Sequence, residues 1–167
     1  MFKPESDKLL EPPEYMGRSP VHITIYCDGA ARGNPGPASY GYVVKDQSGQ
    51  LLLSGNKYLG EATNNEAEYQ GIVAALTSVI QNCPDLAKTL ACPMDTKNWL
   101  IDVRMDSQLV VEQLNGHYKV RNERMRAFYL QVKELEGKFQ SVSYSWLPRE
   151  KNKEADKLAN KAIDSNF

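Results

Sequence analysis

Four acidic residues differ from the rest of the 21 aspartates and glutamates in this 167-residue sequence by the patterns around them. Asp28 and Asp106 each come at the end of a stretch in which apolar and polar residues alternate, as in a strand with one buried face. Glu68 and Asp156 lie on the apolar sides of two predicted helices, where a carboxylate is either partly buried or directed into a site. Converging carboxylates repel one another unless a cation joins them, so a site shared by these residues would favour Mg²⁺ or Mn²⁺.

The glutamate two residues before Glu68 has a structural explanation of its own. Thr63 is a favourable N-cap residue, and Glu66, three positions later, completes a capping box at the start of a helix that Pro84 ends. Glu68 has no such explanation. The chemistry of this segment is therefore assigned to Glu68.

The hydrophobic pattern predicts the elements that position these carboxylates. Alternation over residues 21–27 predicts a strand, and the density of glycine and proline over residues 29–37 predicts a loop after it. Further strands are predicted over residues 39–46, 50–59, 99–105 and 139–147, and helices over 109–114, 122–136 and 152–164. Residues 82–98 are interpreted as a long connection whose structure the pattern does not define.

Together these elements indicate an α/β fold, with a mixed sheet covered by helices. A right-handed crossover through the first long helix makes the strands that lead to Asp28 and Asp106 parallel. Their carboxyl ends then lie at one edge of the sheet, where open α/β sheets place their ligands. Asp28 and Asp106 are expected to be neighbours there.

Composition excludes several classes of protein. Twenty basic and 21 acidic side chains give a net charge of −1, which excludes a strongly cationic protein but allows a local basic patch. Three cysteines without a C-x-x-C motif argue against a disulfide framework or a zinc knuckle, although Cys83 and Cys92 could pair. His22 and His117 are the only histidines, too few for a zinc hydrolase with several histidine ligands.

The chain is predicted to comprise an irregular N-terminal arm over residues 1–20 and a single domain over residues 21–167. No apolar run approaches the roughly 20 residues of a membrane helix. Residues 1–20 also lack the basic start and apolar core of a secretory signal. We therefore expect a cytoplasmic protein without a membrane partner, and a monomer is the default expectation.

Four segments, taken in order, resemble the motifs of the ribonuclease H family, type 1. They are residues 28–37 with Tyr40-Gly41-Tyr42 after them, residues 63–68, residues 106–110 and residues 154–159. The resemblance covers residues 21–163. It implies a ribonuclease H-like fold, a five-stranded mixed sheet in which three antiparallel strands are followed by two parallel ones, flanked by helices.

The resemblance also implies hydrolysis of the RNA strand of RNA/DNA hybrids, leaving 5′-phosphate and 3′-hydroxyl ends. Two Mg²⁺ ions take part, and Mn²⁺ is expected to substitute. Asp28 would be shared by both ions as a catalytic carboxylate and metal ligand. Asp156 would hold the ion that activates water, and Glu68 and Asp106 would hold the ion near the leaving group.

Several residues are predicted to contact the substrate. The 2′-hydroxyl in a shallow minor groove distinguishes RNA from DNA, and the residues that resemble the family's groove contacts are Asn64, Asn65 and Gln108. Gly29 lets backbone approach closely. Asn34 and Thr63 resemble phosphate contacts on the DNA strand, although Thr63 is also explained as a helix cap and Asn34 as part of a rigid turn.

The sequence departs from the best-known family pattern. The loop before the last helix has no histidine, and Arg149 or Glu150 could replace it in proton handling or product release, or be plain surface charges. There is no room for the extra helix and basic handle of some bacterial members, as in the compact branch of archaea and some bacteria. Residues 82–98 are longer than usual, and residues 1–20 do not resemble a hybrid-binding domain.

A local positive surface is predicted between Asp106 and Asp156, either as a hybrid-binding patch or as a solvated helix face; its residues are Lys119, Arg121, Arg124 and Arg126. Two other functions fit the fold, a catalytically silent hybrid-binding module and another two-metal nuclease related to Holliday-junction nucleases or integrases. The presence of all four carboxylates argues against the first. Residues 63–65, which would read the 2′-hydroxyl, argue against the second.

Overall fold

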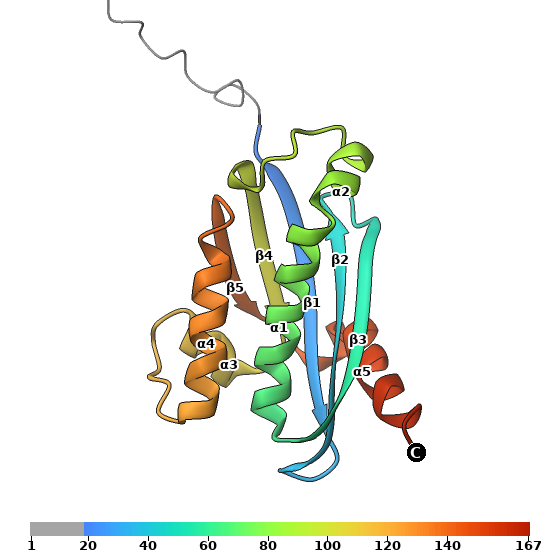
Figure 1. Ribbon diagram of the computed structural model, residues 1–167, viewed down its shortest axis with the longest axis vertical. Helices are drawn as coiled ribbons and strands as arrows, with labels where there is room; N and C mark the ends of the chain where they lie inside the picture. Colours follow the sequence, from blue (N-terminus) through green and yellow to red (C-terminus); the bar gives the residue numbers. More distant parts are fainter. Residues whose placement is uncertain (1–18) are drawn as a thin grey trace, which may run out of the picture.

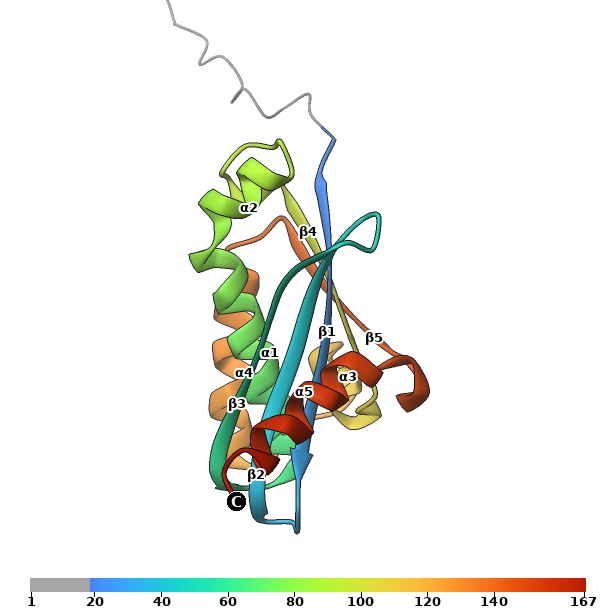
Figure 2. The ribbon, with the colours of Figure 1, turned by 90° about the vertical axis from the view of Figure 1, so that its right-hand side faces the viewer.

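The computed structural model describes residues 19–167, which form a five-stranded sheet with helices on both faces (Figures 1 and 2). The strands are β1 Val21–Ala31, β2 Gly36–Asp46, β3 Leu51–Ala62, β4 Trp99–Met105 and β5 Ser141–Trp146. The helices are α1 Asn64–Gln81, α2 Cys83–Thr89, α3 Gln108–Leu114, α4 Glu123–Glu136 and α5 Lys153–Asp164, with short 3₁₀ turns at Thr96–Asn98 and Arg149–Lys151. The arm predicted over residues 1–20 lies almost entirely outside the described residues.

The strand order β3-β2-β1-β4-β5 confirms the predicted mixed sheet. β1, β2 and β3 pair antiparallel, whereas β1 pairs parallel with β4 and β4 parallel with β5. Tyr26 lies opposite Arg104 near the end of the β1–β4 pairing. Because β1 and β4 run in the same direction, their carboxyl ends reach one edge of the sheet.

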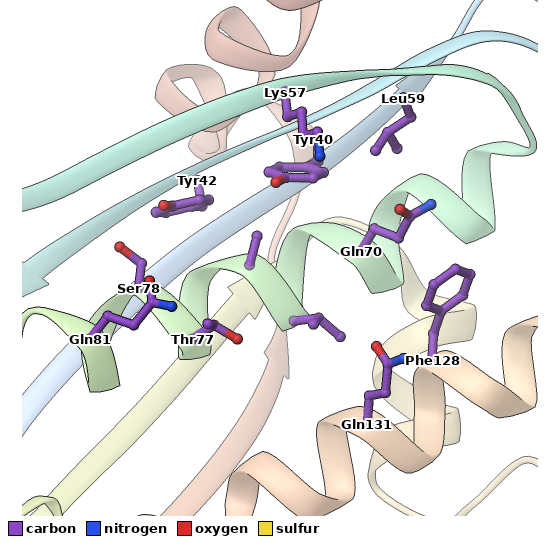
Figure 3. A pocket seen from close by; sticks show the side chains of 12 residues that line it. Tyr40, Tyr42, Lys57, Leu59, Gln70, Thr77, Ser78, Gln81, Phe128 and Gln131 are labelled. Atoms are coloured by element: carbon purple, nitrogen blue, oxygen red, sulfur yellow. The ribbon is translucent and has the colours of Figure 1, made fainter.

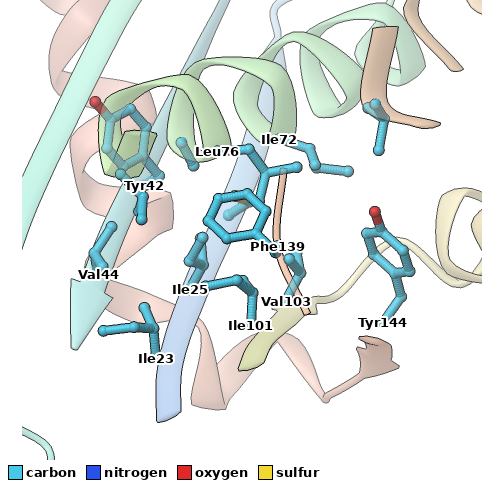
Figure 4. Close-up of a cluster of buried hydrophobic side chains, with 14 of the residues drawn as sticks. Ile23, Ile25, Tyr42, Val44, Ile72, Leu76, Ile101, Val103, Phe139 and Tyr144 are labelled. Atoms are coloured by element: carbon cyan, nitrogen blue, oxygen red, sulfur yellow. The ribbon is translucent and has the colours of Figure 1, made fainter. Parts of the chain in front are cut away.

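The main hydrophobic core lies between the sheet and α1, with α4 beside α1 (Figure 4). Ile25 of β1 and Val103 of β4 are fully buried, as are Ile72 and Leu76 on the facing side of α1. The alternation predicted for β4 is confirmed, because every second residue from Trp99 to Met105 is buried. α5 packs over β1, β2 and β3 on the opposite face (Figure 2).

The loop predicted over residues 29–37 is confirmed only for residues 32–35, and the strands on either side are longer than predicted. β1 continues to Ala31 and β2 begins at Gly36, so Asp28 lies inside β1, opposite Gly41, rather than at the strand's end. The Arg32 N–H donates to the Pro37 carbonyl at 2.8 Å and closes the turn. Glycine and proline are compatible with these strands because pairing with the neighbouring strand satisfies the backbone and helix α1 packs against Gly29. β3 likewise extends to Ala62, beyond the predicted residue 59.

Residues 82–98 contain more structure than the pattern indicated. α1 ends at Gln81, and Pro84 lies in the first turn of α2, where the missing N–H of proline costs no helical hydrogen bond. Leu86 and Ala87 of α2 are buried against the core, which stabilises this short helix. Cys83 and Cys92 are free thiols. Within residues 19–167, every helix is too short or too polar to cross a lipid bilayer.

Candidate active site

Three carboxylates converge at the edge of the sheet where β1 and β4 end. Asp28, Glu68 and Asp106 each place a carboxylate oxygen within 4.8 Å of the others. Asp28 is 5% exposed and Glu68 is 2% exposed, so two of the three groups are almost removed from water. Asp106 follows the last residue of β4 directly, and Glu68 lies in the first turns of α1. The parallel strands thus bring together residues that are far apart in the sequence.

Asp156 reaches the same place from the opposite face of the sheet. It lines a cleft of about 530 Å³ together with Asp28, Glu68 and Asp106. Its Oδ1 accepts hydrogen bonds from Arg149 Nη2 at 3.2 Å and from Asn160 Nδ2 at 3.1 Å. Asp156 lies at the rim of the cleft, outside the group of three carboxylates that meet within 4.8 Å.

Two glycines let the helices that carry these carboxylates approach the sheet. A Cβ atom on Gly29 would lie 2.4 Å from the Glu68 nitrogen, so the absent side chain makes room for the backbone of α1. A Cβ atom on Gly41 would lie 2.4 Å from the Ala155 carbonyl oxygen of α5. Because Gly41 pairs with Asp28, the two close approaches place Glu68 and Asp156 on either side of Asp28. The close approach expected at Gly29 is therefore made by the protein's own helix.

Asn152, which the sequence analysis did not single out, connects α5 to β1 beside Asp28. Its Nδ2 donates to the Cys27 carbonyl at 2.7 Å, and its backbone carbonyl accepts the N–H of Asp156 at 3.1 Å. Asn152 is 1% exposed and makes no side-chain cap on α5. An asparagine just before a helix usually indicates an N-cap, so only the contact with Cys27 identifies this role.

The surroundings raise the pKa of both buried carboxyls. Burial, and then the charges of Asp106 and Asp156, raise the pKa of Asp28 from its usual 3.8 to about 8. Burial and the charges of Asp28 and Asp106 also raise the pKa of Glu68, against the opposing effect of hydrogen bonds from Gly29 and Asn64. The cluster is therefore unfavourable for negative charge until a cation or a proton compensates it.

The first turn of α1 is held by a capping box and by an arginine from α4. Glu66 Oε2 accepts the Thr63 N–H at 2.8 Å, and Thr63 Oγ1 accepts the Glu66 N–H at 3.2 Å, which confirms the predicted box. Glu66 Oε1 also lies 2.9 Å from Arg124 Nε. Asn34 Oδ1 accepts the N–H of Asn64 at 3.0 Å. Asn34 therefore does more than form a turn, since it ties the β1–β2 connection to α1.

The remaining predicted site residues are divided between the cleft and the surface beside it. Asn64 and Arg149 line the cleft, and Gln108 begins α3 immediately after Asp106 and Ser107. Asn65 lies in the first turn of α1. Glu150 lines a different hollow, with Tyr26 and Lys45.

The comparisons with known proteins agree with this geometry. The family model described as "Reverse transcriptase-like" matches residues 26–83 and 82–162. A protein named ribonuclease HI from Halobacterium salinarum is 37% identical over 171 residues, covering 95% of this chain and 77% of that protein. This chain belongs to the type 1 ribonuclease H family.

Solved ribonuclease H1 structures share the fold. The crystal structure of LC11-RNase H1 in complex with an RNA/DNA hybrid has a TM-score of 0.72 and 38% identity, covering 86% of this chain and 98% of that one. A "bifunctional protein" of Mycobacterium tuberculosis is 40% identical over 146 residues, which cover 87% of this chain. The chain spans only 36% of the length of that mycobacterial relative.

The ribonuclease H family implies divalent metal ions, and the residues present fit them. Glu68 Oε2 is buried and has no hydrogen-bond partner in the described part of the chain, so it has an unused acceptor directed into the cluster. The cluster offers only carboxylate oxygens, the ligands that Mg²⁺ and Mn²⁺ prefer. Coordination by a cation would satisfy Glu68 and lower the electrostatic cost of ionising Asp28.

A second hollow of the ribonuclease H domain is unsuited to this chemistry. It has a volume of about 430 Å³ and lies between β2, β3, α1 and α4 (Figure 3). Tyr40, Gln70 and Phe128 are among its lining residues, and none of the lining residues is acidic. The carboxylate cleft is therefore the candidate active site.

Proposed function

We propose that this ribonuclease H is an endonuclease that hydrolyses the RNA strand of RNA/DNA hybrids and leaves 5′-phosphate and 3′-hydroxyl ends. The observation that carries the proposal is the convergence of Asp28, Glu68 and Asp106 within 4.8 Å in an open cleft. The hybrid bound by LC11-RNase H1 supports the choice of substrate.

Asp28, Glu68, Asp106 and Asp156 would hold two Mg²⁺ ions, with Asp28 shared between them and Mn²⁺ as a substitute. Such ions, when bound, lower the pKa of a water ligand and stabilise the charge that develops on the leaving oxygen. The helices and strands keep the four carboxylates in place through the packing at Gly29 and Gly41 and through Asn152.

Recognition of RNA is proposed for the residues beside the cleft. Asn64, Asn65 and Gln108, with the backbone at Gly29, would contact the minor groove and its 2′-hydroxyls. Thr63 and Asn34 would contact phosphates of the DNA strand. The Nε of Arg124 is engaged by Glu66, so its exposed Nη groups are oriented for a phosphate of the same duplex.

Of the two roles considered for Arg149 in place of the family's histidine, proton handling and product release, we propose only product release. A guanidinium stays protonated and cannot exchange a proton with water at neutral pH. Its contact with Asp156 therefore favours product release, in which Arg149 competes for the carboxylate or attracts the new 5′-phosphate. Glu150 faces a separate hollow and has no place in this mechanism.

We also propose that residues 21–167 act as a single domain and as a monomer. All described strands belong to one sheet, and the cleft is built from that sheet and its own helices. A cytoplasmic location is also part of the proposal, as the sequence analysis expected.

The test is cleavage of matched RNA/DNA, DNA/DNA and RNA/RNA duplexes in Mg²⁺, with Asp28→Asn as the inactive control. We expect internal nicks in the RNA strand of the hybrid and none in its DNA strand or in DNA/DNA, with ends that a 5′-phosphate-dependent exonuclease degrades. Equal cleavage of DNA/DNA would indicate another nuclease of this fold. Hybrid binding without cleavage would indicate a silent binding module.

A further inference from the structure

Trp146, the last residue of β5, is a large apolar side chain exposed beside the catalytic cleft. It is 53% exposed and lines the cleft together with Asp106 and Arg149. Among the exposed large apolar residues of the described chain, it alone lines this cleft. Single exposed apolar side chains are common on proteins, so the argument depends on its position and on how it is held.

The indole ring is anchored at one edge. Its Nε1–H donates to the backbone carbonyl of Asp106 at 3.2 Å, and the next residue, Leu147, donates its N–H to the Met105 carbonyl at 3.0 Å. The strand end and the ring are thus both tied to the β4–α3 turn. A ring with a fixed orientation loses little conformational entropy when a ligand packs against it.

The direction of the ring follows from the alternation of β5. Tyr144 lies two residues earlier on the same face of the strand and is buried. Trp146 continues that face to the end of the strand, where the cleft opens. Its hydrogen bond to Asp106 leaves the flat faces of the indole available.

We infer that the Trp146 indole packs against a sugar of the RNA strand next to the scissile phosphodiester. The inference rests on the proposed function. In a duplex the faces of the bases are covered by their neighbours, so the sugars present the apolar surface that an aromatic ring in the minor groove can reach. Aromatic contacts of this kind are tolerant of sequence, in agreement with an enzyme that reads the sugar rather than the base.

Intrinsic fluorescence provides a direct test, because the chain has two tryptophans and Trp99 is fully buried. Asp28→Asn protein is titrated with an uncut RNA/DNA hybrid, and acrylamide quenching is measured with and without it. We expect the hybrid to change the emission and to protect it from acrylamide, and both effects to disappear in Asp28→Asn/Trp146→Phe. Unchanged emission and quenching at saturating hybrid would overturn the inference. A change in emission and quenching that single-stranded RNA causes and the hybrid does not would also overturn it.

Substitutions separate a substrate contact from support of Asp106. Trp146→Ala should weaken hybrid binding about fivefold, the weak end of what aromatic contacts to nucleotides contribute, and Trp146→Phe should retain most of the affinity. Leu51→Ala, at an equally exposed position (53%) that does not line the cleft, should bind as the wild type does. If Phe and Ala lower kcat equally and leave hybrid affinity unchanged, Trp146 only braces Asp106 and the inference is wrong.

Failure of this inference is distinguishable from failure of the proposed function. A wild-type protein that cleaves the hybrid while Trp146 neither responds to it nor contributes to affinity would overturn the inference alone. A wild-type protein that neither binds nor cleaves the hybrid would overturn both. Thermal melts of each variant establish that the comparison is made between folded proteins, and the fluorescence measurement needs no alanine variant.

Discussion

The Nε of Arg124 lies 2.9 Å from Oε1 of Glu66, and this ion pair joins the N-terminus of α4 to that of α1. Glu66 is 4% exposed, and its other oxygen accepts the N–H of Thr63. One carboxylate therefore completes a helix cap and connects two helices. The neighbouring carboxylate cluster instead contains Glu68, two residues further along α1, which lines the cleft.

The two glutamates of this segment should respond differently to the same change. Glu66→Gln keeps the capping box and weakens only the pair with an exposed arginine, so we expect a loss of no more than about 1 kcal/mol in unfolding free energy and activity near the wild type. Glu68→Gln should be inactive and folded. Urea denaturation and hybrid cleavage measure both, and the reverse pattern of activity would show that the roles are exchanged.

The stability of the metal-free protein should depend on pH through Asp28. Its pKa is about 8 in the folded chain and about 4 in the unfolded chain. Between these values the folded state holds a proton that the unfolded state has lost, so this contribution falls as pH rises from about 4 to about 8. Asp28→Asn should therefore become more stable relative to the wild type between pH 5 and pH 8, by up to about 4 kcal/mol.

Asp46→Asn is the matched control when the unfolding free energy of Asp28→Asn and the wild type is measured as a function of pH. Asp46 is partly exposed at the end of β2, and hydrogen bonds from the Ser48 side chain and the Gln50 N–H lower its pKa. It is ionised in both states throughout pH 5 to 8, so the stability difference from the wild type should be flat there. A flat difference for Asp28→Asn as well would contradict burial of an acidic group in the cluster.

Mg²⁺ should raise the melting temperature of the wild type, because it binds the folded cluster and not the unfolded chain. Asp106→Asn removes one ligand and one negative charge, so it should melt higher than the wild type in chelator and gain less from millimolar Mg²⁺. Melting curves with chelator and with Mg²⁺ at matched ionic strength measure both effects. If Asp106→Asn melts lower in chelator and Mg²⁺ shifts neither protein, these carboxylates do not share a metal site.

The loop between α3 and α4 should contribute to hybrid binding through charge. Lys119, Arg121 and Arg126 line a hollow there with Tyr118. Arg121→Ala should reduce the slope of log K against log salt by about 0.9, the value for one lost phosphate contact on duplex DNA. Lys88→Ala, in α2 at the far end of the molecule (Figure 1), should leave the slope unchanged. Equal slopes for the wild type and Arg121→Ala would identify this surface as a solvated helix face.

Gly41→Ala should displace α5, since the added carbon would lie 2.4 Å from the Ala155 carbonyl. We expect a loss of about 3 kcal/mol in stability and a fall in activity through Asp156. Gly137→Ala, at the end of α4 with an ordinary φ of −61°, should be nearly neutral. Chemical denaturation and cleavage assays compare the two. Full activity in Gly41→Ala would mean that α5 does not set the position of Asp156.

Features that depend on neighbouring residues could be predicted from the sequence alone. The alternation of β4 and the capping box of Thr63 and Glu66 are local patterns, and both are present in the structure. The order of four acidic motifs also indicated the family. These signals are readable because a strand period or a helix cap involves only residues close together in the chain.

Only the tertiary structure decided where those residues meet and what holds them. The extension of β1 past Asp28 depends on pairing with β2, and α2 forms where Leu86 packs on the core. The contact of Asn152 with Cys27 and the close approach of α5 at Gly41 join segments more than 100 residues apart. Such contacts follow from the packing of a whole helix against the sheet, and no local pattern of residue types encodes them.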